Sequence, residues 1–285
     1  MNSVVRQLHE QNTDVVMVDT GNSYEGLCEY LGGKYISYTE EKPITMNPFR
    51  INREEMNVEK TGFLKNLVLL IWKGTQGTIT KTEDRLIEHV ITEYYDAYFN
   101  GFEGFTPQQR EDLRKSLVID DRNRGEQKGE SEQERAARIE DTINKIESRR
   151  MKLKVKELSF NSFYEYSVQR IPDICDENRI TGIDISTYRY MMKDFYRGGN
   201  HDKTLNENMD SSLFDETFIV FEIDSIKDDP LLFPLVTLII MDVFLQKMRI
   251  KKSRKVLVIE EAWKAIASPL MAEYIKFMCA PVQAA

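Results

Sequence analysis

Three short, mostly apolar runs, each followed directly by an acidic residue, most constrain the fold of this chain. They span residues 15–18, 218–223 and 256–259, and the acids that follow are Asp19, Asp224 and Glu260. Short apolar runs bounded by polar residues are typical of buried strands, and strands buried on both faces are typical of parallel sheets covered by helices. Because ligands bind at the carboxyl ends of such strands, the acids mark the edge where a site is expected.

Between the first two runs, from about residue 52 onward, apolar residues recur at the spacing that is typical of helices. One helical face carries Phe63, Leu64, Leu67, Val68 and Ile71, and the next carries Leu86, Ile87, Val90, Ile91, Tyr94 and Tyr98. This spacing of three and four residues predicts amphipathic helices. Thr80 and Glu83 form a predicted capping box, whereas the almost purely polar residues 120–135 predict a mobile loop.

These patterns predict an α/β fold in which a mostly parallel sheet is interrupted by a large all-helical insertion; that the sheet is incomplete follows only from the family resemblance described below. Residues 1–51 and 214–285 form the predicted sheet-bearing core, and residues 52–213 form the inserted subdomain. A helical insertion in one sheet explains the return of strand signals after the helices better than three independent domains do.

The most apolar stretch, residues 231–248, is predicted to be a buried helix. Pro234, Asp242, Gln246 and Lys247 interrupt it. The stretch therefore falls short of the ~20 apolar residues that a membrane span requires.

Composition and charge narrow the function classes. The formal net charge of −8 argues against general electrostatic binding of nucleic acid. Two basic stretches, residues 149–154 and 251–255, could contact DNA, but neither is interleaved with aromatic residues, and solvated faces are the commoner explanation. The cysteines and histidines are too scattered for a zinc site or a disulfide framework and indicate a reducing cytoplasm. They are Cys28, Cys175, Cys279, His9, His89 and His201.

The acid pair Glu260-Glu261 is the most informative chemical signal. In P-loop NTPases, one carboxylate serves the Mg²⁺ shell and another group positions the attacking water. The alternative is an ordinary buried strand followed by solvated acids. No G-x-x-x-x-G-K-[ST] phosphate loop is present, because residues 74–78 and 101–105 lack the Lys-Ser/Thr ending. The amphipathic helix predicted for residues 1–11 is the one that would follow such a loop.

Six segments, in order and spacing, resemble the large conjugation ATPases of type IV secretion systems, and among them the TraG-type ATPases of conjugative transposons. They are residues 1–7 (MNSVVRQ), 19–24 (DTGNSY), 32–36 (GGKYI), 44–49 (ITMNPF), 218–222 (FIVFE) and 259–263 (IEEAW). The resemblance extends from Met1 to about Phe277, so it covers nearly the whole chain.

The resemblance implies a RecA-like ATPase core with an all-helical subdomain inserted in it, and ATP and Mg²⁺ as cofactors. It also implies a homo-hexamer that works with other type IV secretion components at the cytoplasmic side of the inner membrane and supplies energy for DNA or protein export. By this resemblance, Glu260 would hold Mg²⁺ directly or through water, and Glu261 would orient or deprotonate the attacking water. Asp19 would lie near the nucleotide, at the end of the neighbouring strand.

Three departures from the family pattern lead us to expect a fragment that binds ATP weakly or not at all and is inactive alone. The phosphate loop should lie just before Met1, the usual Asp-Glu pair is Glu260-Glu261, and residues 278–285 do not follow the family pattern. A sheet without its phosphate-loop strand and final strands should also have exposed apolar edges, which favour self-association.

Two other functions remain open on the sequence alone. The chain could be a non-catalytic interaction module whose helical insertion binds another secretion component or a neighbouring subunit. It could instead be a metal-dependent enzyme that uses Asp19, Asp224 and Glu260 as a carboxylate cluster, as in two-metal nucleases. The lack of an accompanying histidine weighs against the second of these.

Overall fold

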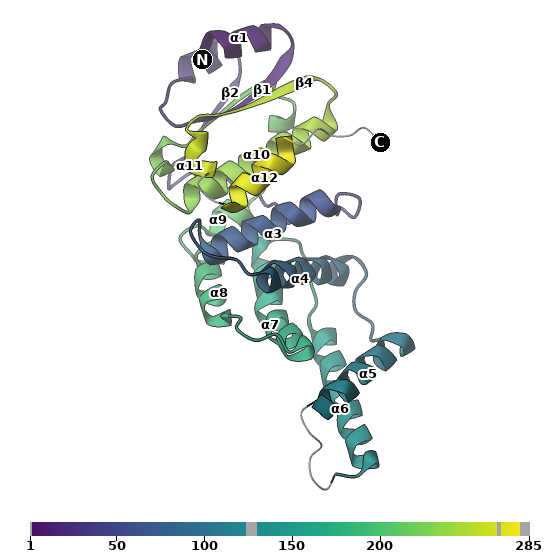
Figure 1. Cartoon of the computed structure of the whole chain (residues 1–285). Coiled ribbons are helices and arrows are strands. Elements are labelled where there is room, and N and C mark those ends of the chain that lie inside the picture. The colour runs from purple at the N-terminus through teal and green to yellow at the C-terminus, as the bar shows by residue number, and fades with distance from the viewer. Residues whose placement is uncertain (1, 124–129, 267–268, 280–285) are drawn as a thin grey trace.

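A four-stranded parallel sheet forms the upper part of the molecule in Figure 1. The computed structural model describes residues 2–123, 130–266 and 269–279. The strands are β1 (Thr13–Asp19), β2 (Lys34–Ser37), β3 (Phe218–Glu222) and β4 (Arg254–Ile259), in the spatial order β2-β3-β1-β4. Every pairing within this sheet is parallel. The predicted α/β class with a mostly parallel sheet is confirmed.

The three strands predicted from apolar runs are direct neighbours. Val15 of β1 lies opposite Phe218 of β3 on one side and Val256 of β4 on the other. All residues of β1 and β3 are buried, whereas β2 and β4 form the two edges of the sheet and are partly exposed. Self-association through these edges stays a prediction.

Alternate residues of the central strands face two separate cores. One face packs against α1 (Asn2–Glu10) and α2 (Glu25–Tyr30), and the other packs against α10 (Leu232–Ile250) within the larger core. On β1 the first set is Val15 and Met17, and the second is Val16 and Val18. Figure 1 shows α1 above the sheet and α10 below it.

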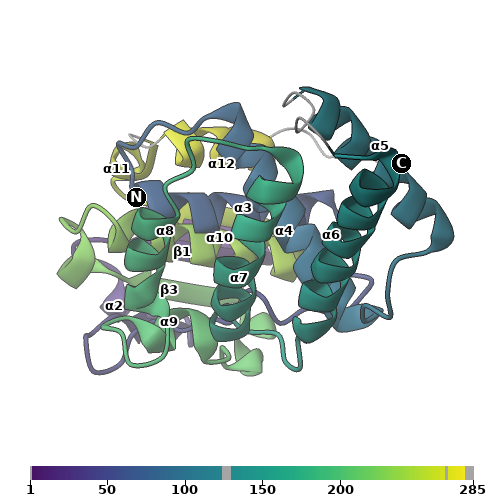
Figure 2. The ribbon, with the colours of Figure 1, turned by 90° about the horizontal axis from the view of Figure 1, so that it is seen from below.

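A helical body lies beyond α10, on the side away from α1 (Figure 1). It contains α3 (Val58–Lys73), α4 (Lys81–Phe99), α5 (Pro107–Asn123), α6 (Glu132–Lys152), α7 (Phe160–Asn178), α8 (Ile185–Met192) and α9 (Asp202–Asn206). Figure 2 shows α7 and α8 crossing in front of α3 and α10. The capping box predicted for Thr80 and Glu83 opens α4. One continuous core joins sheet and helices, so the proposed boundaries of the inserted subdomain stay a prediction.

Short elements complete the fold. Single helical turns occur at Lys193–Phe195, Ser211–Phe214 and Asp224–Ile226, and the chain after β4 forms α11 (Ala262–Ile266) and α12 (Pro269–Cys279). The last of these helices packs against α3.

The α5–α6 hairpin overturns part of one prediction. The sequence predicts a mobile loop over residues 120–135, but α5 continues to Asn123 and α6 begins at Glu132. The prediction is therefore wrong at both ends of that stretch. Its middle, residues 124–129, lies outside the described residues.

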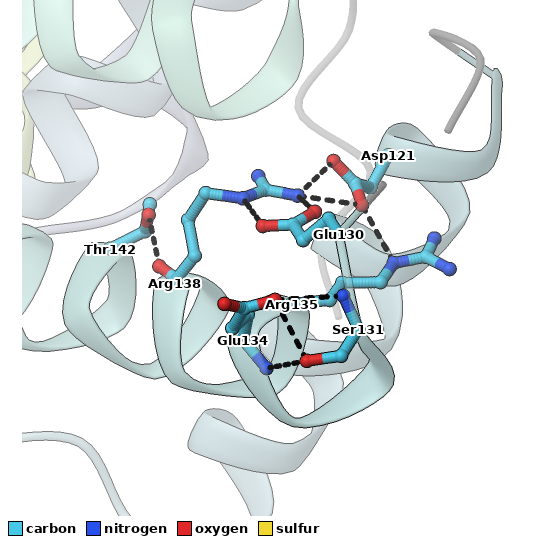
Figure 3. A network of polar contacts seen from close by, with 7 residues as sticks. All are labelled: Asp121, Glu130, Ser131, Glu134, Arg135, Arg138 and Thr142. Carbon is cyan, nitrogen blue, oxygen red and sulfur yellow. Dashed lines mark hydrogen bonds and ion pairs between the residues drawn. The ribbon is translucent and has the colours of Figure 1, made fainter. Parts of the chain in front are cut away.

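A network of charges explains why this polar stretch is helical (Figure 3). Arg138 of α6 donates to the two oxygens of Asp121 of α5 at 2.8 and 2.9 Å, and to Glu130 at 2.8 Å. Ser131 and Glu134 form a capping box at the start of α6. Single exposed ion pairs contribute about 0–1 kcal/mol, but several that share one arginine restrict both helix ends together. Composition alone does not reveal this pairing.

The apolar helix α10 is buried between the sheet and the helical body, as predicted. Of its 19 residues, 14 are buried, and the exposed ones lie near its C-terminal end. Within the described ranges, no helix combines the length and the apolar character that crossing a bilayer needs.

A buried ion pair joins α10 to the helical body. Lys60 Nζ of α3 lies 2.7 Å from Asp242 Oδ2 of α10, and the two side chains are 4% and 5% exposed. Gln246 Nε2 also donates to Asp242 Oδ2 at 2.7 Å. The lysine ammonium lies 4.7 Å from the centre of the Phe63 ring. Each charge has a partner, which is the condition for keeping it in a core.

A second buried network joins α6 and α7 to α4. Glu93 of α4 accepts from Arg170 of α7 at 2.7 Å and pairs with Arg150 of α6 at 3.0 Å. Burial alone would raise the pKa of Glu93. The hydrogen bond and charge of Arg170, with the charge of Arg150, outweigh burial and hold this pKa below its usual range.

We expect Asp242→Ala to lower the free energy of unfolding by about 3–5 kcal/mol, because it leaves the Lys60 ammonium buried and unpaired. Urea denaturation measures this loss. The double variant Lys60→Met/Asp242→Leu should recover much of it, since no unpaired charge remains. Glu10→Ala, which removes the exposed partner of Arg6, is the control and should cost less than about 1 kcal/mol. Equal losses in Asp242→Ala and Glu10→Ala would contradict the role given to the pair.

The lowered pKa of Glu93 predicts a pH-dependent contribution to stability. A carboxyl group whose pKa is lower in the folded state stabilises the fold above its unfolded pKa of about 4.3, and that contribution is lost as pH falls through the folded pKa. The stability gap between the wild type and Glu93→Gln should therefore shrink as pH falls below about 4. Glu103→Gln alters an exposed acid and should show no such change. A gap for Glu93→Gln that stays constant in urea unfolding at each pH would disprove the account.

Candidate functional site

The carboxyl edge of the sheet brings the predicted site residues together. Asp19 and Glu222 lie opposite each other at the ends of β1 and β3. The N–H of Glu260 donates to the carbonyl of Val18 at 3.0 Å, which places the first residue after β4 beside the end of β1. Asp19 and Glu260 thus lie on neighbouring strands, and Glu261 follows directly.

Asp19 organises the turn between β1 and α2. It is fully buried, and its Oδ1 accepts from the N–H of Gly21 at 3.0 Å. Its Oδ2 accepts from the N–H groups of Ser23 at 2.9 Å and Tyr24 at 3.2 Å. Three main-chain donors occupy this carboxylate, so its contacts are those of a turn rather than of an open ligand site.

Tyr24 links that turn to the acid pair. Its side chain is 2% exposed, and its hydroxyl donates to Glu260 Oε1 at 2.8 Å. Burial first, and then the hydrogen bond to Glu260 and the charge of Glu260, raise the pKa of Tyr24 above its usual range. The hydroxyl therefore keeps its proton and remains a donor. Through Tyr24, the turn built on Asp19 fixes one oxygen of Glu260.

Glu261 lies in a different environment from Glu260. Its φ of 48° is in the left-handed region, which costs a residue with a side chain about 1–2 kcal/mol. Its Oε2 lies 2.9 Å from Lys264 Nζ, which also contacts Asp228 Oδ1 at 3.0 Å. The hydrogen bonds to Glu261 and then to Asp228 raise the pKa of Lys264. The ammonium thus ties Glu261 to the loop between β3 and α10.

The acids of the carboxylate cluster that the sequence left open have local partners. Glu222 Oε2 accepts from Ser37 Oγ at 2.7 Å, and Glu222 Oε1 accepts from the N–H of Asp224 at 2.6 Å. Asp224 pairs with Lys227 at 2.7 Å. Across the described ranges, no group of three His, Cys, Asp or Glu side chains is arranged to hold a metal ion. The hypothesis of a metal-dependent enzyme that uses Asp19, Asp224 and Glu260 stays untested, but local turns and ion pairs engage each of these acids.

The acid pair retains free carboxylate oxygens. Neither Glu260 Oε2 nor Glu261 Oε1 has a hydrogen bond to another described side chain or main-chain group. Carboxylate oxygens are ligands that Mg²⁺ accepts, and Mg²⁺-nucleotide sites take one or two of them, with phosphate and water filling the other positions. Glu260 and Glu261 therefore suit a Mg²⁺-phosphate ligand better than they suit a metal held by protein groups alone.

Two residues of the site were missed at the sequence level. Lys264 follows Glu261 by three residues at the start of a helix, and that spacing places side chains on one face. This signal was present and could have predicted the ion pair. Tyr24 lies 236 residues from Glu260 in the chain. No local pattern connects the two, and only the adjacency of β1 and β4 brings them together.

Comparison with known proteins gives one family and one fold. A family model described as the TraG P-loop domain matches residues 1–108 and 97–284. No curated protein sequence matches the chain significantly. Among solved structures, the chain is similar to VirB4 of Thermoanaerobacter pseudethanolicus, with a TM-score of 0.56 and 17% identity over 97% of this chain and 60% of that chain. At this identity the match shows a shared fold, and the chain spans less than two thirds of that protein.

The turn contacts of Asp19 predict a structural effect without any ligand. Asp19→Asn should lower the free energy of unfolding by about 1.5–3 kcal/mol, because an amide nitrogen cannot accept the main-chain donors that the lost oxygen accepted. Asp14→Asn is a matched control on the same strand, since Asp14 is 5% exposed and accepts from the Ser253 hydroxyl at 2.9 Å. It should cost less than about 1 kcal/mol. Urea denaturation in which the two variants lose equal stability would refute the turn role.

Proposed function

The chain belongs to the family of TraG P-loop domains, and on that premise we propose that it is part of a motor ATPase of conjugation or type IV secretion. The motor would couple ATP hydrolysis to the export of DNA or protein. The observation that carries the proposal is the acid pair Glu260-Glu261 at the carboxyl end of β4, next to β1 in a parallel sheet. That is where open α/β sheets bind ligands.

Glu260 is the proposed Mg²⁺ residue, directly or through water. Tyr24 holds Oε1, so the orientation of the carboxylate is fixed before any ligand binds, while Oε2 remains available. A Mg²⁺ ion held by Glu260 would supply positive charge that offsets the negative charge of the ATP phosphates. Pre-orientation of this kind reduces the reorganisation needed during the reaction.

Glu261 is the proposed catalytic residue that orients the attacking water and accepts its proton. In the described geometry its carboxylate pairs with Lys264 at 2.9 Å. While the ammonium group occupies Oε2, that oxygen is not available to a water molecule. We therefore propose that this pair opens when Glu261 acts, and that Glu261 then turns its free carboxylate toward the nucleotide.

Asp19 is proposed to lie near the nucleotide and to position other residues of the site, without contacting the nucleotide itself. Its carboxylate fixes the turn that carries Tyr24, and Tyr24 fixes Glu260. This gives the acid at the end of β1 a specific task that the sequence did not supply.

Residues 1–285 contain no G-x-x-x-x-G-K-[ST] loop, so we propose that alone they bind ATP weakly and do not hydrolyse it. The proposed assembly is a homo-hexamer at the cytoplasmic face of the inner membrane, in contact with other secretion components and at most indirectly with DNA. The partly exposed edge strand β4 supports the need for a further partner at that edge.

A second candidate function is a non-catalytic interaction module. The α5–α6 hairpin favours it, because the hairpin projects from the helical body (Figure 1) and is ordered by its own charge network rather than by a large core. Such a hairpin offers a surface for a neighbouring subunit or another secretion component.

Kinetics of the longer protein that carries both this chain and a phosphate loop would decide between these functions. Glu261→Gln should leave Mg²⁺-ATP binding intact and reduce turnover by about 10²–10⁴-fold, because an amide cannot accept the proton of water. Glu260→Gln should weaken Mg²⁺-ATP binding itself. Calorimetry and phosphate release measure the two effects.

The control for this test is Glu29→Gln, which changes an exposed acid on α2 and should alter neither quantity. Unchanged turnover in Glu261→Gln would favour the interaction module. ATP hydrolysis by residues 1–285 alone, lost in Glu261→Gln, would show that the chain needs no external phosphate loop.

A further inference from the structure

Lys264 connects the helix that follows β4 with the loop between β3 and α10. Its Nζ lies 2.9 Å from Glu261 Oε2 and 3.0 Å from Asp228 Oδ1, and it donates to the carbonyl of Lys227 at 3.3 Å. The strands β3 and β4 are not neighbours, because β1 lies between them. One ammonium group therefore joins two separate loops at the carboxyl edge of the sheet, and one of its two acids is the proposed catalytic residue.

The two acids that share this ammonium differ in how their main chains are held. The loop that carries Asp228 is fixed on both sides, because Ile226 is 6% exposed and Asp229 Oδ1 accepts from main-chain N–H groups at the start of α10, at 2.8 and 2.7 Å. Movement of this loop would uncover Ile226 and remove the cap of α10. Glu261 instead has a left-handed φ of 48°, so a change in its conformation would relieve strain. Glu261 is therefore the partner that can leave at lower cost.

A second acid lowers the cost of releasing the first. The Lys264 side chain is 21% exposed, and a partly buried ammonium without an acceptor would be unfavourable. If Glu261 leaves, Asp228 and the Lys227 carbonyl still accept two of the three N–H groups of the ammonium. The Glu261 side chain is 41% exposed, so water can replace the lysine at its carboxylate. Opening of the pair then leaves neither charge unsolvated.

On the basis of the proposed function, we propose that Lys264 is a positioning residue that holds Glu261 in a resting conformation, and that Asp228 retains the lysine when Glu261 turns to the attacking water. Lys264 then opposes the chemical step and Asp228 promotes it, although the two side chains contact each other. A lysine that only joined the two loops would differ, because loss of either partner would then impair the site in the same direction.

Acetylation of lysines in residues 1–285, followed by mass spectrometry, tests the shared partners without any nucleotide. The neutral amine is the nucleophile, so an ammonium stabilised by acids reacts slowly. Glu261→Gln and Asp228→Ala should each raise the rate at Lys264 less than about threefold, because one acid remains. The double variant should raise it about tenfold or more. The exposed Lys115 of α5 is the internal reference and should react equally in all four proteins.

The acetylation rates can overturn the proposal directly. A rate in Glu261→Gln that already equals the rate in the double variant would show that Asp228 does not hold the lysine. A double variant that reacts no faster than the wild type would show that neither acid does.

Single-turnover hydrolysis of saturating Mg²⁺-ATP by the longer protein with a phosphate loop tests the direction of each effect. Lys264→Met should speed the chemical step and Asp228→Ala should slow it, each by about twofold to fivefold, the range of one exposed ion pair. The double variant should behave as Lys264→Met does, because Asp228 acts only through the lysine. Lys115→Met is the control and should leave the rate unchanged. If Lys264→Met does not fold, Lys264→Gln keeps a polar side chain and should act in the same direction.

The signs separate failure of this role from failure of the ATPase assignment. Slower chemistry without the lysine, changes of the same sign in both single variants, or wild-type rates in both would overturn the positioning role. The ATPase function would stand in those cases, provided that Glu261→Gln still reduces turnover. Unchanged turnover in Glu261→Gln would instead contradict the proposed function itself.

Discussion

The buried pair of Lys60 and Asp242 is the contact on which the relation between sheet and helices depends. Helix α10 covers one face of the sheet, and α3 packs on α10, so any loosening at that contact separates the two halves of the large core. An ion pair in this position specifies one orientation of α3, because a shifted helix would leave two buried charges unpaired. Lys247 of α10 adds a second constraint, since its ammonium donates to the carbonyl groups of Leu213, Phe214 and Glu216.

The pairing of strands in the sheet positions the residues of the candidate site. Parallel pairing of β1 with β4 places Tyr24 next to Glu260, and Lys264 connects Glu261 to the loop that leaves β3. The two adjacent acids are therefore held by opposite means, one by a neutral donor and the other by a cation. These different partners are compatible with the two different tasks proposed for the acids, one at the metal and one at the attacking water.

The sequence predicted the strands and the place of the acid pair because both depend on local patterns. Apolar runs and periodicity found β1, β3 and β4, and the order of the motifs located Glu260 at the end of a strand. The sequence could not predict that main-chain N–H groups of the following turn donate to the Asp19 carboxylate, because those hydrogen bonds depend on the exact path of the main chain. It also missed the helical ends of the α5–α6 hairpin, since polar composition does not distinguish solvated charges from charges that pair across two helices.

At Glu261, the left-handed backbone conformation lowers the stability of the fold, whereas the proposed chemistry requires a carboxylate at the same position. Glycine would adopt that conformation without strain, and asparagine with less strain than glutamate, but neither has a carboxylate that can accept a proton. Selection for thermal stability alone would therefore tend to remove the residue proposed to act on water. If active relatives also have a glutamate with this backbone conformation, its retention would indicate a functional role. Attempts to stabilise this fold should therefore leave the position unchanged.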